Sequence, residues 1–592
     1  MKAVTDPAKL LLARMLRLLR WRVWIQERLQ PTEWQVTLLW AGFVGWLGAL
    51  SSLMFSALAE GVHHVLSGSS AGVVESMRQL PWWAVLALPA VGGGLAGLVL
   101  LLGKHLTRGQ SSTDYMEAIL IGSGNVPVRA SLVKSAAALF SIGSGGSIGR
   151  EGPMVQLAAV MASLIGRWRQ FTPPQLRLLV ACGASAGIAS AYNAPIAGSF
   201  FVAEIILGTI AMETLGPLAV SAVVAALTVR VMTSEQHLYK VPEFTLHSPL
   251  EMPAYILLGL IVGTLAPWFL RSLRRAENLF IATRLPLIAR LMLGGLIVGA
   301  LAIKIPEVAG NGYSVVVNIL NGHVLWSTLL VIVVCKWLAT ASSFGSGAPG
   351  GVFTPSLFMG ASVGFVFGTA VNAIWPGAAA DPRAFALVGM GAFLSAVSHA
   401  PVMAVIMLFE MTLSYDIILP LMIASVVAYY TAKGIEGRSL YSDALRKKAA
   451  ETPGATDFAI GRVAELMKPK PPTLPRQAHF AEIARLFLAM RVNNLYVTDA
   501  EDRFLGAVSL HDIKPYLGEP ELAELVIASD ILREDFPVVG PDATLSDALG
   551  RFLNFEGERL PVVDSGGKLL GSLSKGDLLL ALVEARKKPG AA

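Results

Sequence analysis

Residues 143–153 read GSGGSIGREGP, and residues 345–355 read GSGAPGGVFTP. Both runs open with Gly-Ser-Gly, end in proline and lie among long apolar stretches. Proline suits the first turn of a helix because its ring presets φ and its missing amide would be unpaired there, and glycine lets the backbone approach a ligand. Each run is therefore typical of a helix start inside an apolar layer. The free amides of such a start carry about half a positive charge and attract anions.

A second pair of matching segments follows these loops. YNAPIAGSFFVAE ends at Glu204, and SHAPVMAVIMLFE ends at Glu410. The same order of loop, Ala-Pro helix start and glutamate in two halves indicates an internal duplication, with a binding site between the halves. A carboxylate inside a membrane is costly unless it is paired, so we expect both glutamates to bind neighbouring backbone and to hold the fold or a dimer contact. The two repeats are predicted at residues 33–232 and 252–435.

Composition places the chain in a membrane. Of 592 residues, 54% are hydrophobic and 15% are charged, and the mean hydropathy is +0.60. Runs without Asp, Glu, Lys or Arg are long enough to cross or deeply enter an apolar layer of about 30 Å. These runs are residues 35–59, 80–103, 178–203, 337–380 and 384–409. The pattern predicts an all-α polytopic membrane protein whose glycine- and proline-broken helices line a cavity.

Charge at the two flanks of the membrane region predicts its orientation. Residues 1–32 contain five arginines between Arg14 and Arg28 and no cleavable signal pattern, and Arg446, Lys447 and Lys448 follow the last apolar run. Basic flanks stay on the cytoplasmic side, so both termini are predicted to be cytoplasmic in an inner or plasma membrane. The formal charge of +6 fits these flanks and gives no reason to expect nucleic-acid binding. Cys182 and Cys335 have apolar neighbours and are expected to pack as small apolar side chains rather than form a disulfide or bind a metal.

Several motifs resemble those of a known family, the CLC chloride channels and transporters. The resemblance covers about residues 33–445 and is carried by GSGNVP (122–127), GREGP (149–153), GVFTP (351–355) and Tyr441 within SLYSDAL. It implies a membrane domain with two inverted-topology repeats, and a homodimer in which each subunit has its own anion pore.

The resemblance also implies roles for single residues. Glu151 would be the gating glutamate, Ser123 and Tyr441 would offer hydroxyls to a central chloride, and Val352 and Phe353 would offer backbone amides. The remaining anion-binding residues would be Gly149, Arg150 and Gly152. A dehydrated chloride needs hydrogen-bond donors without a full charge that would hold it too long, and hydroxyls and helix-start amides satisfy this need. Ser123 as a turn residue, Tyr441 as an interfacial anchor and Arg150 as a helix-flanking charge are the alternatives.

Two positions bear on the transport mode. Glu151 sits at a helix start, so its carboxylate can occupy the place of an anion, and protonation or competition by an anion would release it. The proton-coupled members of the resembled family carry a second glutamate after the position of Glu204, where this chain has Ile205. We therefore expect a voltage- or pH-gated chloride channel, with a chloride/proton antiporter that uses another proton route as the alternative. The resemblance implies chloride rather than nitrate, since nitrate-preferring members of that family carry proline at the position of Ser123, and transport of fluoride or another anion is a more remote alternative.

From about residue 455 the composition becomes that of a soluble protein. LYVTDAEDRFLGAVSLHDI (495–513) aligns without a gap on LPVVDSGGKLLGSLSKGDL (560–578), 65 residues later. Each copy predicts two strands and a helix. The pair resembles tandem cystathionine β-synthase (CBS) domains, predicted here at 455–518 and 525–585 as a soluble α+β module.

Both copies contain the pattern G-x-x-S-x-x-D. Ser509 and Asp512 in the first copy match Ser574 and Asp577 in the second. In CBS pairs that bind an adenine nucleotide these positions contact ribose and phosphate, as a carboxylate beside a helix start can. Serine and aspartate are also common helix caps, so a module that only stabilises the cytoplasmic face is the alternative.

Other function classes fit the sequence less well. A divalent-cation transporter needs clustered carboxylates, and the apolar runs contain very few. A membrane-embedded enzyme needs a nucleophile with a base or a cluster such as HExxH, and His399 in SHAP stands alone. We therefore expect no enzyme activity, no metal site and no required cofactor.

Overall fold

The structure is a computed structural model. It describes residues 33–106, 115–120, 122–233, 251–375, 381–437, 439–441, 461–469, 471–490, 493–513, 516, 525–553, 555, 557–578 and 581. The predicted cytoplasmic segment 1–32 and the basic residues 446–448 lie outside them. The chain forms two compact units, Met1–Leu445 and Arg446–Ala592, each of which is described by itself.

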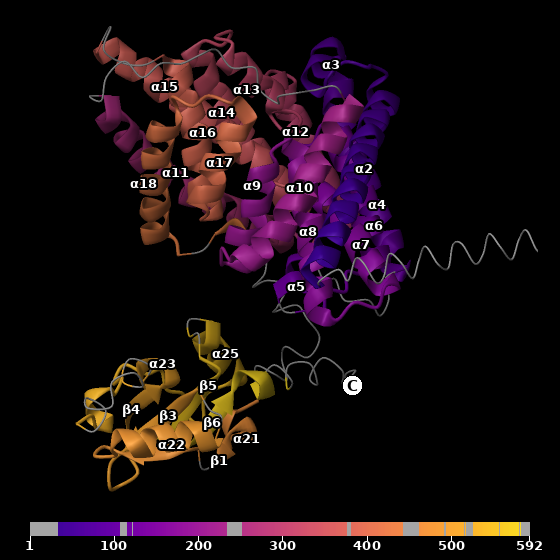
Figure 1. The fold of residues 1–592 in the computed structure, drawn as a ribbon. Helices are drawn as coiled ribbons and strands as arrows, with labels where there is room; N and C mark the ends of the chain where they lie inside the picture. The colour runs from indigo at the N-terminus through magenta and orange to yellow at the C-terminus, as the bar shows by residue number, and fades with distance from the viewer. Residues whose placement is uncertain are drawn as a thin grey trace, which may run out of the picture. The chain divides into compact units, whose positions relative to one another are not determined.

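The first unit is helical in all its described residues except for short loops (Figure 1). Its first half contains α2 (Glu33–Ser67), α3 (Val73–Gln79), α4 (Trp82–Leu106), α5 (Tyr115–Leu120), α6 (Val128–Gly143), α7 (Glu151–Trp168), α8 (Pro173–Tyr192), α9 (Pro195–Phe200), the π-helix η1 (Phe201–Leu207) and α10 (Met212–Thr233). Its second half contains α11 (Met252–Ala282), α12 (Leu287–Ala302), the 3₁₀ turn η3 (Pro306–Val308), α13 (Tyr313–Leu320), α14 (Trp326–Ser346), α15 (Phe353–Ile374), α16 (Pro382–Ser398), α17 (Pro401–Thr412) and α18 (Ile418–Ile435).

Many of these helices are long and apolar enough to cross a membrane. Among the described residues seven meet both conditions: Trp34–Ser67, Trp82–His105, Met212–Thr233, Met252–Ala282, Trp326–Ser346, Phe353–Ile374 and Ile418–Ile435. Shorter apolar helices occur at Pro195–Leu207, Leu287–Ala302, Pro382–Ser398 and Pro401–Thr412. The short helices are the interrupted ones that the glycine and proline pattern predicts.

Glycine allows the helices around the candidate site to pack very closely. A Cβ on Gly187 of α8 would lie 2.6 Å from the Cα of Val155 in α7. In the second half, a Cβ on Gly389 of α16 would lie 2.3 Å from the carbonyl oxygen of Gly360 in α15. No side chain fits at either point. Small residues at such contacts are typical of helices in membranes, where close backbone packing replaces the hydrophobic effect.

The second unit contains two small sheets. Its elements are α21 (Val463–Leu466), β1 (Lys468–Pro469), β2 (Thr473–Pro475), α22 (Phe480–Met490), β3 (Asn494–Thr498), β4 (Phe504–Ser509), α23 (Leu510–Ile513), η5 (Ala528–Asp530), α25 (Leu545–Leu553), β5 (Arg559–Val563) and β6 (Leu569–Ser574). The strand orders are β2-β3-β4 and β1-β6-β5. The register confirms the sequence repeat, since Leu495 pairs with Val508 and Leu560 with Leu573, each 65 residues later. Each sheet covers its own apolar cluster.

Candidate functional site

The two Gly-Ser-Gly loops meet at the centre of the first unit. The amide of Gly149 donates to the carbonyl of Gly351 at 2.6 Å, and the amide of Gly351 donates back at 2.8 Å. Helix α7 begins two residues after the first glycine, at Glu151, and α15 begins two residues after the second, at Phe353. The residues that precede the two helices, Arg150 and Val352, make no side-chain cap bond to them. The positive ends of two helices, one from each half, are therefore held side by side.

The carboxylate of Glu151 lies at this junction and is buried, with 4% of the residue exposed. Its Oε1 accepts hydrogen bonds from the hydroxyl of Tyr192 at 2.8 Å and from the hydroxyl of Thr354. Its Oε2 is buried and has no hydrogen-bond partner in the part of the chain that the structure describes. An anionic group thus occupies the space between two helix starts and keeps one oxygen available.

The loop glycines make room for this carboxylate. A Cβ on Gly149 would lie 2.0 Å from Oε2 of Glu151, and one on Gly351 would lie 2.8 Å from it. Gly152 follows Glu151 in the first turn of α7, and Val352 precedes the first turn of α15. The predicted residues of both motifs therefore surround one buried point.

Aromatic rings connect this point to Tyr441. The ring of Phe353 lies 5.0 Å from that of Tyr192 and 6.4 Å from that of Phe201, centre to centre. Phe201 in turn meets the ring of Tyr441 edge-on at 5.6 Å. Tyr441 is half-buried against the apolar core of the unit. The structure thus links Tyr441, Phe353 and Glu151, which the sequence predicted.

Sequence reasoning missed Tyr192, Thr354 and Phe201. Thr354 lies inside the GVFTP motif, and Tyr192 directly precedes the Asn-Ala-Pro segment. A buried carboxylate needs donors, so the hydroxyls within the motifs were a usable signal. Which hydroxyl faces Glu151 depends on how the halves pack, and that was not visible in the sequence.

Ser123 lies in the loop between α5 and α6. Its side chain is exposed, and its hydroxyl accepts a hydrogen bond from the side-chain amide of Asn125 at 2.8 Å. The hydroxyl of Ser163 on α7 donates to the carbonyl of Gly124 at 2.9 Å and accepts from the amide of Val126 at 3.0 Å, which fixes this loop. Within the described residues, we find no hydrogen bond or ring contact that joins Ser123 to Tyr441.

Arg150 lies beside the gate candidate and lines a cavity of about 750 Å³. The cavity is bounded by the end of α2, by residues 69–75 and by residues 309–314. Its charged and titratable lining includes Glu60, His63, His64, Glu75 and Arg78. Arg150 therefore lies at a cavity whose two arginines are matched by two glutamates.

The two intramembrane glutamates bind the opposite half. The carboxylate of Glu204 accepts from the amides of Val402 at 3.2 Å and Met403 at 2.7 Å, in the first turn of α17. The carboxylate of Glu410 accepts from two amides in the first turn of α9, at 3.0 and 2.7 Å. The expected backbone pairing is therefore present, and each half supplies the anion that caps a helix of the other.

In the second unit the candidate nucleotide residues are engaged by cations. A guanidinium nitrogen of Arg533 binds Asp512, and Nζ of Lys468 lies 2.9 Å from Oδ2 of Asp577. Both the cations and the aspartates are 65 residues apart, so the two ion pairs are copies of each other. Partial burial disfavours the charged form of Asp512, but the hydrogen bond from Arg533 outweighs it and lowers the pKa of Asp512. Lys468 likewise lowers the pKa of Asp577.

Both aspartates also take part in helix starts. The amide of Asp512 donates to the hydroxyl of Ser509 at 3.3 Å, and the amide of Asp577 donates to that of Ser574 at 3.0 Å. Asp512 accepts in return from the amide of Ser509 at 3.1 Å. The capping role that the sequence left open is therefore present, and a ribose would have to compete with it.

Comparison with known proteins follows the same division of the chain. A family profile described as voltage gated chloride channel matches residues 92–433. The chain belongs to this family, known as CLC. A CBS domain profile matches residues 463–519 and 528–584. The resemblance stated from the motifs is thereby confirmed, and so is the fold class of a helical CLC membrane domain followed by a CBS region.

Several relatives match over most of their length. A ClcB-like chloride channel protein of Ralstonia nicotianae is 50% identical over 416 residues, which are 70% of this chain and 97% of that protein. The voltage-gated ClC-type chloride channel ClcB of Salmonella typhimurium is 41% identical over 70% of this chain and 99% of its own. CLC members are transporters or channels, so the protein is not an enzyme.

Solved structures share the fold. A slow cyanobacterial Cl⁻/H⁺ antiporter matches with a TM-score of 0.62 at 26% identity, over 70% of this chain and 98% of that one. A eukaryotic CLC transporter matches with a TM-score of 0.61 at 18% identity, over 91% of this chain and 97% of that one. The protein is therefore a multi-pass integral membrane protein of a chloride-transporting family.

Proposed function

We propose that this protein conducts chloride through one pathway in each subunit of a homodimer, and that Glu151 gates the pathway. The observation that carries this proposal is the buried carboxylate of Glu151, which lies between the starts of α7 and α15 and accepts a hydrogen bond from Thr354 in the first turn of α15. A group of that charge in that place is what a permeating anion replaces.

The pathway residues act as weak donors. When the Glu151 side chain moves away from the two helix starts, the amides of Val352 and Phe353 and the hydroxyl of Tyr441 would bind a chloride. The hydroxyl of Ser123, in the loop between α5 and α6, would be a further donor. Gly149 and Gly152 would let the backbone approach the ion, and Arg150 would raise the chloride concentration at the cavity. None of these groups except Arg150 carries a positive charge, so the ion would bind weakly enough to leave.

Movement of Glu151 would couple conduction to pH. Protonation removes the charge that the two helix starts hold, and a neutral carboxyl competes poorly with chloride for them. Flux should therefore rise as pH falls. Voltage would act on the same step because it drives chloride toward the site.

Channel conduction is favoured over exchange by Ile205, which follows Glu204 and packs against the apolar core. An isoleucine cannot bind a proton, so an antiporter would need another proton route. Transport of fluoride or another anion is the remaining alternative.

Flux from proteoliposomes tests the proposal. For a channel we expect chloride efflux without proton movement and a reversal potential that does not depend on a pH gradient. Coupled proton uptake would show that the protein is an antiporter and not a channel. Fluoride flux that far exceeds chloride flux would show that fluoride is the transported anion. Absence of any anion flux would overturn the function as a whole.

The assembly and location are part of the proposal. Helices α9, α17 and α18 each expose apolar side chains, among them Ile196 at 50%, Val402 at 41% and Leu419 at 63%. The two glutamates bind α9 and α17 together. This face suits a second copy of the chain in the bilayer. We place the protein in an inner or plasma membrane with both termini in the cytoplasm, on the charge of its flanks.

The last part of the proposal is that the CBS module binds an adenine nucleotide. Ser509 and Asp512 in one copy, and Ser574 and Asp577 in the other, would contact its ribose and phosphate. Because Arg533 and Lys468 already bind the aspartates, a nucleotide would bind by drawing these cations to its phosphates. Titration with ATP, followed by calorimetry, tests this step.

A further inference from the structure

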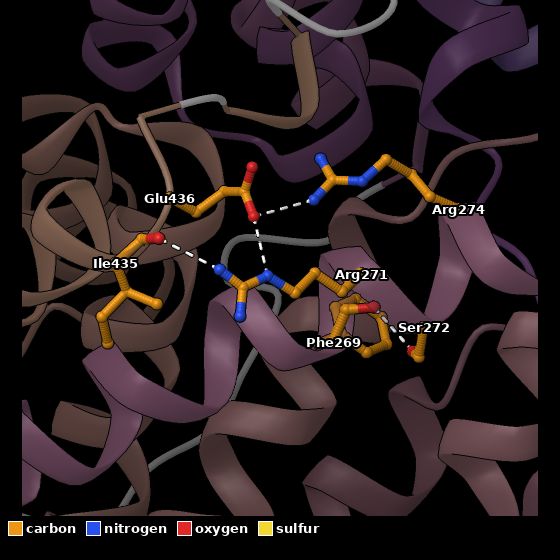
Figure 2. A network of polar contacts seen from close by, with 6 residues as sticks. All are labelled: Phe269, Arg271, Ser272, Arg274, Ile435 and Glu436. Carbon is orange, nitrogen blue, oxygen red and sulfur yellow. Dashed lines mark hydrogen bonds and ion pairs between the residues drawn. The ribbon is translucent and has the colours of Figure 1, made fainter.

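An ion-pair cluster lies where α18 ends. The backbone leaves the helix at Glu436, with φ −142° and ψ 106°. The Nε of Arg271 on α11 donates to Oε2 of Glu436 at 2.8 Å, and a guanidinium nitrogen of Arg274 lies 3.0 Å from the same oxygen (Figure 2). The side chain of Glu436 is 15% exposed. Partial burial disfavours its charge, but the bond from Arg271 and the charge of Arg274 outweigh it and lower the pKa of Glu436.

Arg271 also binds the helix end itself. Its second donor reaches the carbonyl of Ile435 at 3.0 Å (Figure 2). The last carbonyls of a helix have no partner within the helix, so this bond caps α18 as well as pairing the charge. Arg271 and Arg274 lie three residues apart and hence on one face of α11. The cluster therefore fixes both the side chain and the backbone at this exit.

The anchored helix is itself tied to the second loop of the site. The indole N–H of Trp337 on α14 donates to the hydroxyl of Ser272 on α11 at 2.7 Å. The same hydroxyl donates to the carbonyl of Phe269 at 2.6 Å (Figure 2). Helix α14 leads directly into the loop 345–355, which presents Phe353. The position of α11 is thus coupled to that of the loop.

The chain from this cluster to Tyr441 is short. Tyr441 lies five positions after Glu436, a distance of at most about 18 Å in an extended chain. A Cβ on Gly437 would meet nothing within 4 Å, so packing does not hold the chain at that residue. Leu440 and Tyr441 pack against the core. The ring of Tyr441 is therefore held by core packing, and the bonded end of α18 lies a short stretch of chain before it.

We infer that Glu436 is a positioning residue for the anion pathway. By binding Arg271 and Arg274 it ties the end of α18, five residues before Tyr441, to the helix that is bonded to α14 and so to the Phe353 loop, and this limits where Tyr441 can lie relative to that loop. The inference rests on the proposed function, since it requires Tyr441 to contact the permeating anion.

The test is a mutant cycle on anion selectivity. Glu436→Gln, Tyr441→Ala and the double variant are reconstituted, and the nitrate-to-chloride permeability ratio is measured from reversal potentials. Glu436→Gln should change the ratio about 2-fold, in the same direction as Tyr441→Ala and by less, as expected for the loss of a partly buried ion pair. The double variant should match Tyr441→Ala, because Glu436 acts only through Tyr441.

Two further variants keep the test interpretable. Arg274→Gln removes one of the two cations and should give a smaller change of the same sign. Asp381→Asn is the control, because it removes the ion pair between Asp381 and Arg383 at the start of α16. The asparagine oxygen can still accept from the backbone amide of Arg383, and the permeability ratio should be unchanged. Each variant is compared with the unmodified protein by size-exclusion elution, and Arg274→Gln carries the test if Glu436→Gln does not fold.

The outcomes separate the inference from the function on which it rests. If Glu436→Gln changes the permeability ratio equally in the unmodified protein and in Tyr441→Ala, the positioning role is overturned and the proposed pathway stands. An unchanged ratio in Glu436→Gln and in Arg274→Gln, with a changed ratio in Tyr441→Ala, would do the same. An unchanged ratio in Tyr441→Ala would remove Tyr441 from the pathway, and the inference would fall with it.

Discussion

The two halves of the membrane unit share a frame and differ at its centre. Their loops bind each other through Gly149 and Gly351, and their buried glutamates cap each other's helices. When the two loop sequences are aligned from their first glycine, however, Glu151 stands opposite Phe353. One half supplies the carboxylate, and the other supplies a hydroxyl to bind it and an aromatic ring beside it. The duplicated contacts build the frame, and we propose that the unmatched residues provide the function.

The soluble unit repeats this exchange with different chemistry. Its two copies bind each other's segments through Lys468–Asp577 and Arg533–Asp512, which are full ion pairs. The membrane halves use carboxylates on backbone amides instead. Charged pairs lose strong hydration on burial, whereas helix-start amides must be satisfied in any case, so the amides are the better partners in an apolar layer.

The largest expected effect comes from removing the unmatched carboxylate. Glu151→Ala should raise chloride flux about tenfold or more, the factor expected if the carboxylate occupies the pathway in about nine of ten molecules. The rise of flux at low pH should disappear, because no group remains to be protonated. Efflux from proteoliposomes at a series of pH values between about 4.5 and about 7.5, beginning near the ordinary pKa of a glutamate, measures both. Retained pH dependence in the variant would move the gate to another residue.

The matched carboxylates of the frame should behave alike. In Glu204→Gln and Glu410→Gln the remaining carbonyl oxygen can accept from one helix-start amide, but the new NH2 group cannot accept from the other. Each variant should therefore cost about 1 to 3 kcal/mol of stability. Thermal unfolding in detergent should show similar losses of a few degrees for the two variants. A large loss in one and none in the other would show that the halves are not equivalent in strength, whatever their geometry.

These contacts also show what could be predicted from the sequence. Glycine and proline set local backbone geometry, so the helix starts at Glu151, Phe353, Pro195 and Pro401 were correctly expected. That Glu204 binds α17, in the other half, depends on tertiary packing and was not visible. The same holds for Arg271 and Glu436, which lie 165 residues apart.

The site was predictable to the extent that it lies within short motifs. A chain of ring contacts and one hydrogen bond leads from Tyr441 through Phe201, Phe353 and Tyr192 to Glu151. Tyr192 binds the carboxylate from a segment that the sequence singled out for its proline and for Glu204. Tyr192 lies in the first half and Thr354 in the second. Only the packing of the two halves shows that both hydroxyls donate to Oε1 of Glu151.

A moderate effect is expected at the residue that has no counterpart in the loops. Tyr441→Ala should lower the preference for chloride over nitrate about threefold, a loss comparable to one hydrogen bond. Tyr441→Phe keeps the ring against Phe201 and removes only the hydroxyl, so it separates donation from packing. Equal ratios in Tyr441→Phe and the unmodified protein would assign the effect to the ring.

The smallest effect is expected at the duplicated ion pairs of the CBS module. Both pKa values lie below the ordinary value of about 3.9, so the pairs stabilise the module above that pH, and this stabilisation is lost as the pH falls through the lowered values. Asp512→Asn and Asp577→Asn should each cost less than about 1 kcal/mol, because Arg533 and Lys468 are more than half exposed.

Hydrogen exchange of the full-length protein at neutral pH resolves so small a loss. Asp512→Asn should speed exchange of β3 and β4 about threefold, and Asp577→Asn should do the same for β5 and β6, since each pair anchors its own sheet. Acceleration of both sheets by either variant would mean that the copies unfold as one unit. If ATP protects these strands in the unmodified protein and not in the variants, the aspartates bind the ribose. Protection that persists in both variants would leave them as helix caps and partners of the two cations.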